Sequence, residues 1–423
     1  MDGGRFISHV KPSMVDMINA LEKKIGIDVK YFLKNTPSLL TVTIISTIFG
    51  LISSIIMARL LSKDIYGTYL YVLTLINTLS IFSISGMSTA VQRDASRGFD
   101  GILVAGSKIR FKWSFLGSLV LIGAGIYYLT QGNLLLSKCL FLSALFFPFV
   151  YSFDTFFNFV MGKMLFNKYA LYKTIIITIN ATSVVALVLA TENIFWALLA
   201  YFISFSVLQL ILWKKTVQKD KTNDCVDNES IKYGKVLTLQ GTIPMVANQF
   251  DNIVIANSLG MGDLAVFTIA LYVGSFANVP LDIISNLIFP KVAKKDKKEG
   301  TIAVLKNLKY IIMLSIIICG FFAILVPFLI PLFYSASYHD SIFYAQLILV
   351  AQVAFAPGAI LNQMLKAQAR SREMLRILLI TRILEIVLFA VMIPLLGLLG
   401  AVIVRIINNL GFSLITYILI KRG

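Results

Sequence analysis

Cysteine and histidine are scarce in this chain of 423 residues. The three cysteines, Cys139, Cys225 and Cys319, are too far apart in the sequence to form a disulfide framework or a zinc site, and the two histidines stand alone. The sequence also has no nucleotide-binding glycine-rich loop, no paired metal ligands and no serine–histidine pair. We therefore expect no metal, no cofactor and no enzymatic activity.

Charged residues are scarce as well, at 14% of the chain against 58% hydrophobic residues, and the mean hydropathy is +0.83. This balance excludes an ordinary soluble domain. In a soluble protein the formal net charge of +17 would indicate nucleic acid as a partner. Here the distribution of the charges along the chain points to a membrane surface instead, and we expect no nucleic-acid partner.

Long apolar runs dominate the rest of the sequence. Each is close to the ~20 residues that cross ~30 Å of hydrocarbon. Inside a bilayer every backbone amide must be bonded within its own segment, so runs of this length must be helices. We predict an all-α integral membrane protein with twelve transmembrane helices, at residues 36–61, 66–91, 111–130, 134–158, 170–190, 194–213, 235–259, 264–290, 309–333, 342–364, 374–394 and 398–420.

Basic residues occur in every second connection. Seven segments hold 33 of the 38 lysines and arginines, namely residues 1–35, 92–112, 161–173, 214–235, 291–309, 365–376 and the C-terminus. The short connections between these segments hold only Lys63. Because basic connections stay on the cytoplasmic side, both termini are predicted to be cytoplasmic. The tail of residues 1–35 is then either an interfacial helix on the membrane surface or a solvated segment.

The longest internal polar stretch, residues 214–234, is predicted to be a cytoplasmic linker. It divides the chain into two six-helix lobes, residues 36–213 and 235–423. Since six is an even number, both lobes enter the membrane from the same side. They would be parallel repeats with a substrate bound between them.

One stretch carries a family resemblance. Residues 57–97 contain ARLL and YGTY around a short turn and then GMSTA before a basic cluster, and the pattern recurs in outline at residues 256–295. This stretch resembles the Wzx-type polysaccharide flippases of the MOP superfamily, which also holds the MATE exporters and the MurJ-type lipid II flippases.

The resemblance implies a MATE-like fold and a multi-pass flippase of the bacterial cytoplasmic (inner) membrane, acting in the synthesis of O-antigen lipopolysaccharide or a related polysaccharide. Such a protein translocates undecaprenyl-diphosphate-linked oligosaccharide repeat units, here by alternating access between the two lobes. The implied partners are the lipid-linked oligosaccharide, membrane lipids, a polysaccharide polymerase and a chain-length regulator.

Polar residues at helical spacing inside the apolar spans are candidate site residues. An ionisable group costs about 2.5–3.5 kcal/mol at the centre of a membrane helix, so it needs a cavity or a partner. Span 235–259 carries Asn248, Asp251 and Asn252, and span 264–290 carries Asn278 and Asp282. We predict that these residues line a hydrophilic passage for a glycan headgroup. The alternative is that they are polar contacts between helices.

Three further charges lie near the last predicted hairpin. Glu385 is placed to pair with Arg382 on its own helix or with Arg405 across the hairpin. An arginine left unpaired there would bind a diphosphate or an acidic sugar. The alternative is a closed ion cluster. For Arg59, the arginine of ARLL, the resemblance implies a phosphate contact, whereas its position at a helix end favours snorkelling to the interface.

The predicted substrate contacts are therefore Arg59, Asn248, Asp251, Asn252, Asn278, Asp282, Arg382 and Arg405, and protonation of Asp251, Asp282 or Glu385 is predicted to couple transport to an ion gradient. A MATE-like exporter of organic cations is the alternative function, because four acids, namely Asp154, Asp251, Asp282 and Glu385, lie in the spans. A lipid II flippase would have two further helices. A membrane-embedded glycan polymerase or ligase would have a larger outer loop.

Overall fold

The computed structural model describes residues 29–281, 297–368 and 370–422. All regular secondary structure in these ranges is helical, and the principal helices are α2 (Val29–Leu60), α3 (Lys63–Leu79), α4 (Met87–Ser96), α5 (Ile102–Thr130), α6 (Leu134–Ser152), α7 (Thr155–Gly162), α8 (Phe166–Thr191), α9 (Ile194–Lys219), α10 (Asn228–Ser258), α11 (Met261–Gly274), α13 (Lys297–Tyr334), α14 (Asp340–Ala367), α15 (Ser371–Leu396) and α16 (Leu398–Arg422). Three short 3-10 helices, η2 (Ser80–Ser83), η3 (Ser275–Ala277) and η4 (Ala336–Tyr338), adjoin them. The predicted all-α membrane class is confirmed.

Eleven helical segments in the described part are long and apolar enough to cross a membrane. The predicted span 235–259 is not among them, although it lies inside the 31-residue α10. That helix is too polar because it carries Asn248, Asp251 and Asn252 together with lysines in its first turns. Residues 1–28 of the predicted tail lie outside the described residues.

Local sequence explains the short turns that join successive helices. The side chains of Asn133 and Asn193 accept hydrogen bonds from the backbone amides of Leu136 (3.1 Å) and Phe195 (2.9 Å), which caps α6 and α9. Gly260 begins α11 with φ of 113°, a backbone conformation that favours glycine. These turns fall where the apolar runs are interrupted in the sequence.

Two predicted helices are broken, which corrects the predicted spans 66–91 and 134–158. The first ends as η2, turns at Ile84 (φ 53°), and resumes as α4. The second stops at Ser152 and resumes as α7. The predicted connection 92–112 is also wrong, because α5 begins at Ile102 and takes Lys108, Arg110 and Lys112 into a helix.

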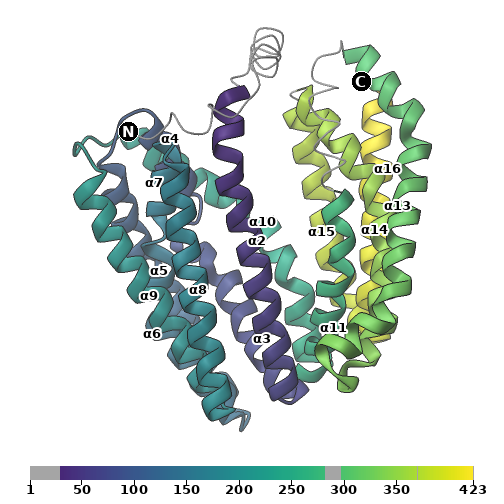
Figure 1. Cartoon of the computed structure of the whole chain (residues 1–423), viewed down its shortest axis with the longest axis horizontal. Coiled ribbons are helices and arrows are strands. Elements are labelled where there is room, and N and C mark those ends of the chain that lie inside the picture. The colour runs from purple at the N-terminus through teal and green to yellow at the C-terminus, as the bar shows by residue number, and fades with distance from the viewer. Residues whose placement is uncertain (1–28, 282–296, 369, 423) are drawn as a thin grey trace, which may run out of the picture.

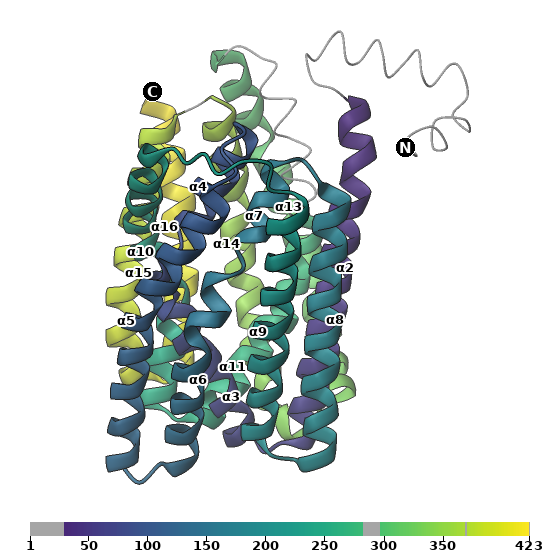
Figure 2. The ribbon, with the colours of Figure 1, turned by 90° about the vertical axis from the view of Figure 1, so that its left-hand side faces the viewer.

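The helices form two groups. Helices α5, α6, α9 and α8 pack side by side with α2 beyond them (Figure 2), and α13, α14, α16 and α15 pack as the second group. Helix α10 contacts both groups, through α3 and α4 on one side and α15 on the other. The groups converge at the end that holds the short turns and spread apart toward the end that holds α4 and α7 (Figure 1). We call these the turn end and the linker end.

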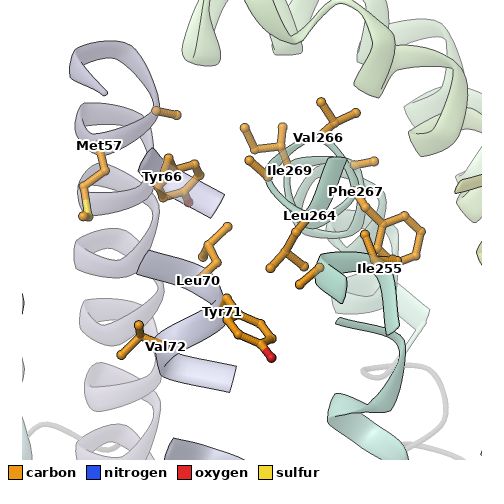
Figure 3. Close-up of a cluster of buried hydrophobic side chains, with 14 of the residues drawn as sticks. Met57, Tyr66, Leu70, Tyr71, Val72, Ile255, Leu264, Val266, Phe267 and Ile269 are labelled. Atoms are coloured by element: carbon orange, nitrogen blue, oxygen red, sulfur yellow. The ribbon is translucent and has the colours of Figure 1, made fainter. Parts of the chain in front are cut away.

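An apolar core joins the two groups at the turn end. Tyr66 and Leu70 of α3 lie opposite Leu264 and Phe267 of α11, and all four are buried (Figure 3). Between membrane helices such side chains stabilise the contact through close van der Waals packing. Gly67 permits the approach of the two helices, because a Cβ at this position would lie 1.8 Å from the carbonyl oxygen of Met261.

The linker is bound to the first group of helices. Both ends of the predicted linker 214–234 are helical, so that only residues 220–227 lie outside α9 and α10. The Asp100 carboxylate accepts hydrogen bonds from the backbone amide (2.8 Å) and the hydroxyl (2.7 Å) of Thr222. It also forms an ion pair with Lys163 (2.5 Å). Burial favours the protonated form of Asp100, but the Lys163 ammonium and the Thr222 donors outweigh it and hold the pKa of Asp100 below its usual value.

Candidate functional site

Four charged side chains from three helices meet in the second group. Arg405 of α16 forms an ion pair and hydrogen bond with Asp251 of α10, and Arg382 donates to Glu385 at 2.6 Å within α15. We call these four residues the charge quartet. Asp251 and Glu385 are buried, whereas the side chains of Arg382 and Arg405 are 30% and 29% exposed.

The pairing settles two alternatives that the sequence leaves open. Glu385 pairs with Arg382 and not with Arg405, because Asp251 takes Arg405. The quartet therefore balances two positive against two negative charges, so the expectation of an unpaired arginine is wrong for this arrangement. Pairing is the arrangement that offsets the cost of burying these charges.

Aromatic rings surround the Arg405 guanidinium. It lies 5.7 Å from the ring centroid of Phe267 in α11 and 6.0 Å from that of Phe389 in α15. Such contacts stabilise a cation by about 0.5–2 kcal/mol. The Nε of Arg405 is buried and has no hydrogen-bond partner among the described residues. The guanidinium is thus held firmly while part of its donor capacity stays unused.

The predicted polar residues near the charge quartet lie in different surroundings. Asn248 is exposed. Asn252 donates its backbone amide to Asp251 (2.8 Å) and its side-chain amide to Thr74 of α3 (3.5 Å). Asn278 is half-buried, just after η3, and Asp282 lies outside the described residues. Among these residues, Asn252 therefore links the charge quartet to α3.

A second buried ion pair lies in the first group, and the sequence analysis missed it. Arg110 of α5 donates to the Asp154 carboxylate (2.6 Å), the Ser88 hydroxyl (2.6 Å) and the Ser83 carbonyl (3.3 Å). Its side chain is 3% exposed. The predicted connection 92–112 places Arg110 in a loop, yet Ser107 and Ser114 at helical spacing on either side indicate a polar helix face.

Arg110 joins the two helix breaks. Ser83 ends η2, Ser88 is in the first turn of α4, and Asp154 precedes α7. A broken helix leaves backbone groups without partners, and inside a membrane only another part of the protein can supply them. The break before α4 also contacts α10, since the Gly86 amide donates to the Thr238 hydroxyl at 3.0 Å.

Arg59 lies apart from the charge quartet, at the turn end. Its guanidinium donates to the backbone carbonyls of Phe333 (2.8 Å, from Nε) and Leu332 in α13. The structure thus brings Asp251, Arg382, Glu385 and Arg405 together, places Asn252 beside Asp251 and leaves Arg59 elsewhere. The described residues contain no group of three or more His, Cys, Asp or Glu side chains that would hold a metal ion.

Comparisons with known proteins agree on the class. Residues 56–343 match the family model described as "Polysaccharide biosynthesis protein". The fold is similar to an inward-facing multidrug resistance MATE family transporter of the MOP superfamily, with a TM-score of 0.70 and 17% identity over 91% of this chain and 97% of that one. An outward-facing structure with the same description has a TM-score of 0.64 and 17% identity over 93% of this chain and 95% of that one. A search of curated proteins finds no match.

Proposed function

Because the chain belongs to a family of polysaccharide biosynthesis proteins and has the fold of a MOP-superfamily transporter, we propose that it is a flippase for undecaprenyl-diphosphate-linked oligosaccharide repeat units. The observation that carries the proposal is a polysaccharide family match over residues 56–343 on a transporter fold that holds buried, paired charges in its second lobe. We place it in the bacterial cytoplasmic membrane with both termini in the cytoplasm.

The arginines of the charge quartet suit an anionic headgroup. Both guanidinium groups are partly exposed, whereas the carboxylates that pair with them are buried, with 7% exposure for Glu385 and 2% for Asp251. A guanidinium has five N–H donors and binds phosphate oxygens in pairs. Arg382 and Arg405 are therefore proposed to contact the diphosphate, and Asn248 and Asn252 the neighbouring sugar.

Coupling to an ion gradient would use the acids of the same quartet. A neutral quartet has no net attraction for a diphosphate. Protonation of Asp251 or Glu385 would leave its arginine without a counter-ion and so raise the affinity for an oxyanion. Asp282 keeps its predicted coupling role, which rests on its sequence position alone.

The described acids argue against a cation exporter. Of the four acids counted in the spans, Asp154, Asp251 and Glu385 each pair with an arginine. An organic cation needs a site with net negative charge, which these neutral pairs do not supply. Resistance of exporter-deficient cells to cationic drugs is therefore expected to stay unchanged when the protein is produced.

Reconstitution tests the proposal directly. Proteoliposomes loaded with a lipid-linked oligosaccharide are assayed for the appearance of the glycan at the opposite leaflet, with lectin binding as the readout. We expect transport by the wild type and its loss in Arg405→Ala. The control Arg372→Ala changes an exposed arginine at the start of α15 and should transport normally. No transport by the wild type in any imposed gradient would refute the function.

The same assay tests the coupling. The response of transport to an imposed pH difference should be weaker in Asp251→Asn and in Glu385→Gln than in the wild type, because neither amide takes up a proton in this pH range. A response equal to that of the wild type in both variants would contradict coupling through the quartet.

A further inference from the structure

Two cations of the first helix group contact the second group at the turn end. Arg59, at the end of α2, donates to two carbonyls in the last turn of α13. The final carbonyls of a helix have no partner within it and form the negative end of its dipole. Arg59 therefore caps a helix of the opposite group, a contact that exists only while the two groups lie together.

Lys63 makes a second contact of the same kind. Its ammonium lies 3.5 Å from the Asp340 carboxylate, at the start of α14, and 5.7 Å from the centroid of the Tyr338 ring. Arg59 and Lys63 stand on either side of the turn between α2 and α3. The turn between α2 and α3 thus contacts both ends of the α13–α14 connection.

Further contacts pack the helices together at the turn end. The Asn257 side chain of α10 donates to the Tyr71 hydroxyl (3.0 Å) and accepts from the Tyr128 hydroxyl (2.7 Å). A Cβ on Gly262 would lie 2.9 Å from the Asp64 carboxylate. The turn end is therefore packed between the groups, whereas the helices spread apart toward the linker end (Figure 1).

We propose that Arg59 and Lys63 form an outer latch that holds the turn end shut in the state seen here, and that exposure of the passage to the outside requires both contacts to break. Arg59 is thereby a positioning residue in this state, since its donors are taken by carbonyls of α13 and not by cargo. The proposal rests on the alternating access of the proposed function.

Disulfide cross-linking measures the latch without any cargo. In a variant whose three native cysteines are replaced by serine, Asp64→Cys and Gly262→Cys place two thiols across the turn end. With the latch intact, oxidant should cross-link them rapidly. Arg59→Ala should lower the closed-to-open ratio by roughly tenfold, because hydrogen bonds from a charged donor contribute on that scale, and the cross-linking rate should fall with the closed population. Arg59→Lys should restore part of the rate.

Charge reversal tests Lys63 and guards against misfolding. Lys63→Asp alone should slow cross-linking, and Lys63→Asp with Asp340→Lys should restore it, which a merely misfolded variant would not do. The control Arg93→Ala removes an exposed arginine from α4 at the linker end and should keep the wild-type rate. Wild-type rates in both Arg59→Ala and Lys63→Asp would overturn the latch. Because no cargo is added, failure of the transport assay leaves this result intact and counts only against the proposed function.

Discussion

Arg110→Ala should destabilise the protein far more than any exposed arginine substitution. The change removes the donor for Ser83, Ser88 and Asp154 at once and leaves the Asp154 carboxylate without its counter-ion. Because these partners lie at two helix breaks, the loss also leaves broken backbone unsupported inside the membrane.

The magnitude follows from burial. Removing one partner of a buried ion pair costs about 3–5 kcal/mol of unfolding free energy. The Arg110 side chain is 3% exposed, but that of Asp154 is 30% exposed and regains some solvation when the arginine is lost. We therefore expect a loss near the lower limit, about 3 kcal/mol. Arg93→Ala, which removes an exposed side chain stacked on Tyr233 at 5.0 Å, should cost about 0.5–1 kcal/mol.

The assay is reversible unfolding by SDS titration in mixed micelles, followed by tryptophan fluorescence. A double-mutant cycle with Asp154→Ala isolates the pair, and the double variant should be more stable than the sum of the single losses predicts by about 1–3 kcal/mol. A loss below about 1 kcal/mol in Arg110→Ala, or strictly additive losses, would refute the view that this pair supports the two breaks.

Three further predictions concern other parts of the chain. Gly86→Ala should cost about 1–3 kcal/mol in the same titration, because its Cβ would meet the α10 backbone at 2.5 Å, whereas Gly123→Ala has open space and should be neutral or stabilising. Burial opposes ionisation of Asp100, but its Lys163 and linker partners hold the pKa below the unfolded value of about 3.9. Hydrogen-exchange protection of the linker should therefore persist from neutral pH down to about pH 4, disappear as the pH falls through the folded-state pKa, and be weak at every pH in Asp100→Asn. Exposed Cys225 should react with a membrane-impermeant maleimide in inside-out vesicles and not in right-side-out ones, and the opposite pattern would contradict the predicted topology.

The sequence predicts the helices well and their interruptions poorly. Hydropathy and basic residues place the turns at Asn133 and Asn193, because a bilayer imposes a length on every apolar run. The same signal cannot detect the breaks at Ile84 and Phe153. The side chains that support those breaks, Arg110 of α5 and Thr238 of α10, come from other helices.

Distance along the chain limits the prediction of the site. Arg382 and Glu385 are three residues apart on one helix, so the sequence predicts their pairing as one of two alternatives. Asp251 and Arg405 are 154 residues apart, and only the packing of α10 and α16 against α15 reveals that they pair. Local spacing therefore predicts the pair within one helix but not the pair between α10 and α16.

The neutrality of the charge quartet constrains any mechanism for an anionic cargo. A diphosphate that approached two intact ion pairs would meet two buried carboxylates as well as two arginines, and the attraction and repulsion would nearly cancel. Binding therefore requires that Asp251 or Glu385 be neutralised, or that one arginine leave its partner. Breaking a pair outright leaves an uncompensated buried charge, which costs several kcal/mol, whereas protonation removes that charge.

A transporter built in this way should take up protons when its cargo binds. Proton uptake upon addition of a polyprenyl diphosphate should therefore vanish in the Asp251→Asn, Glu385→Gln double variant. Equal uptake in both proteins would show that the protons bind elsewhere.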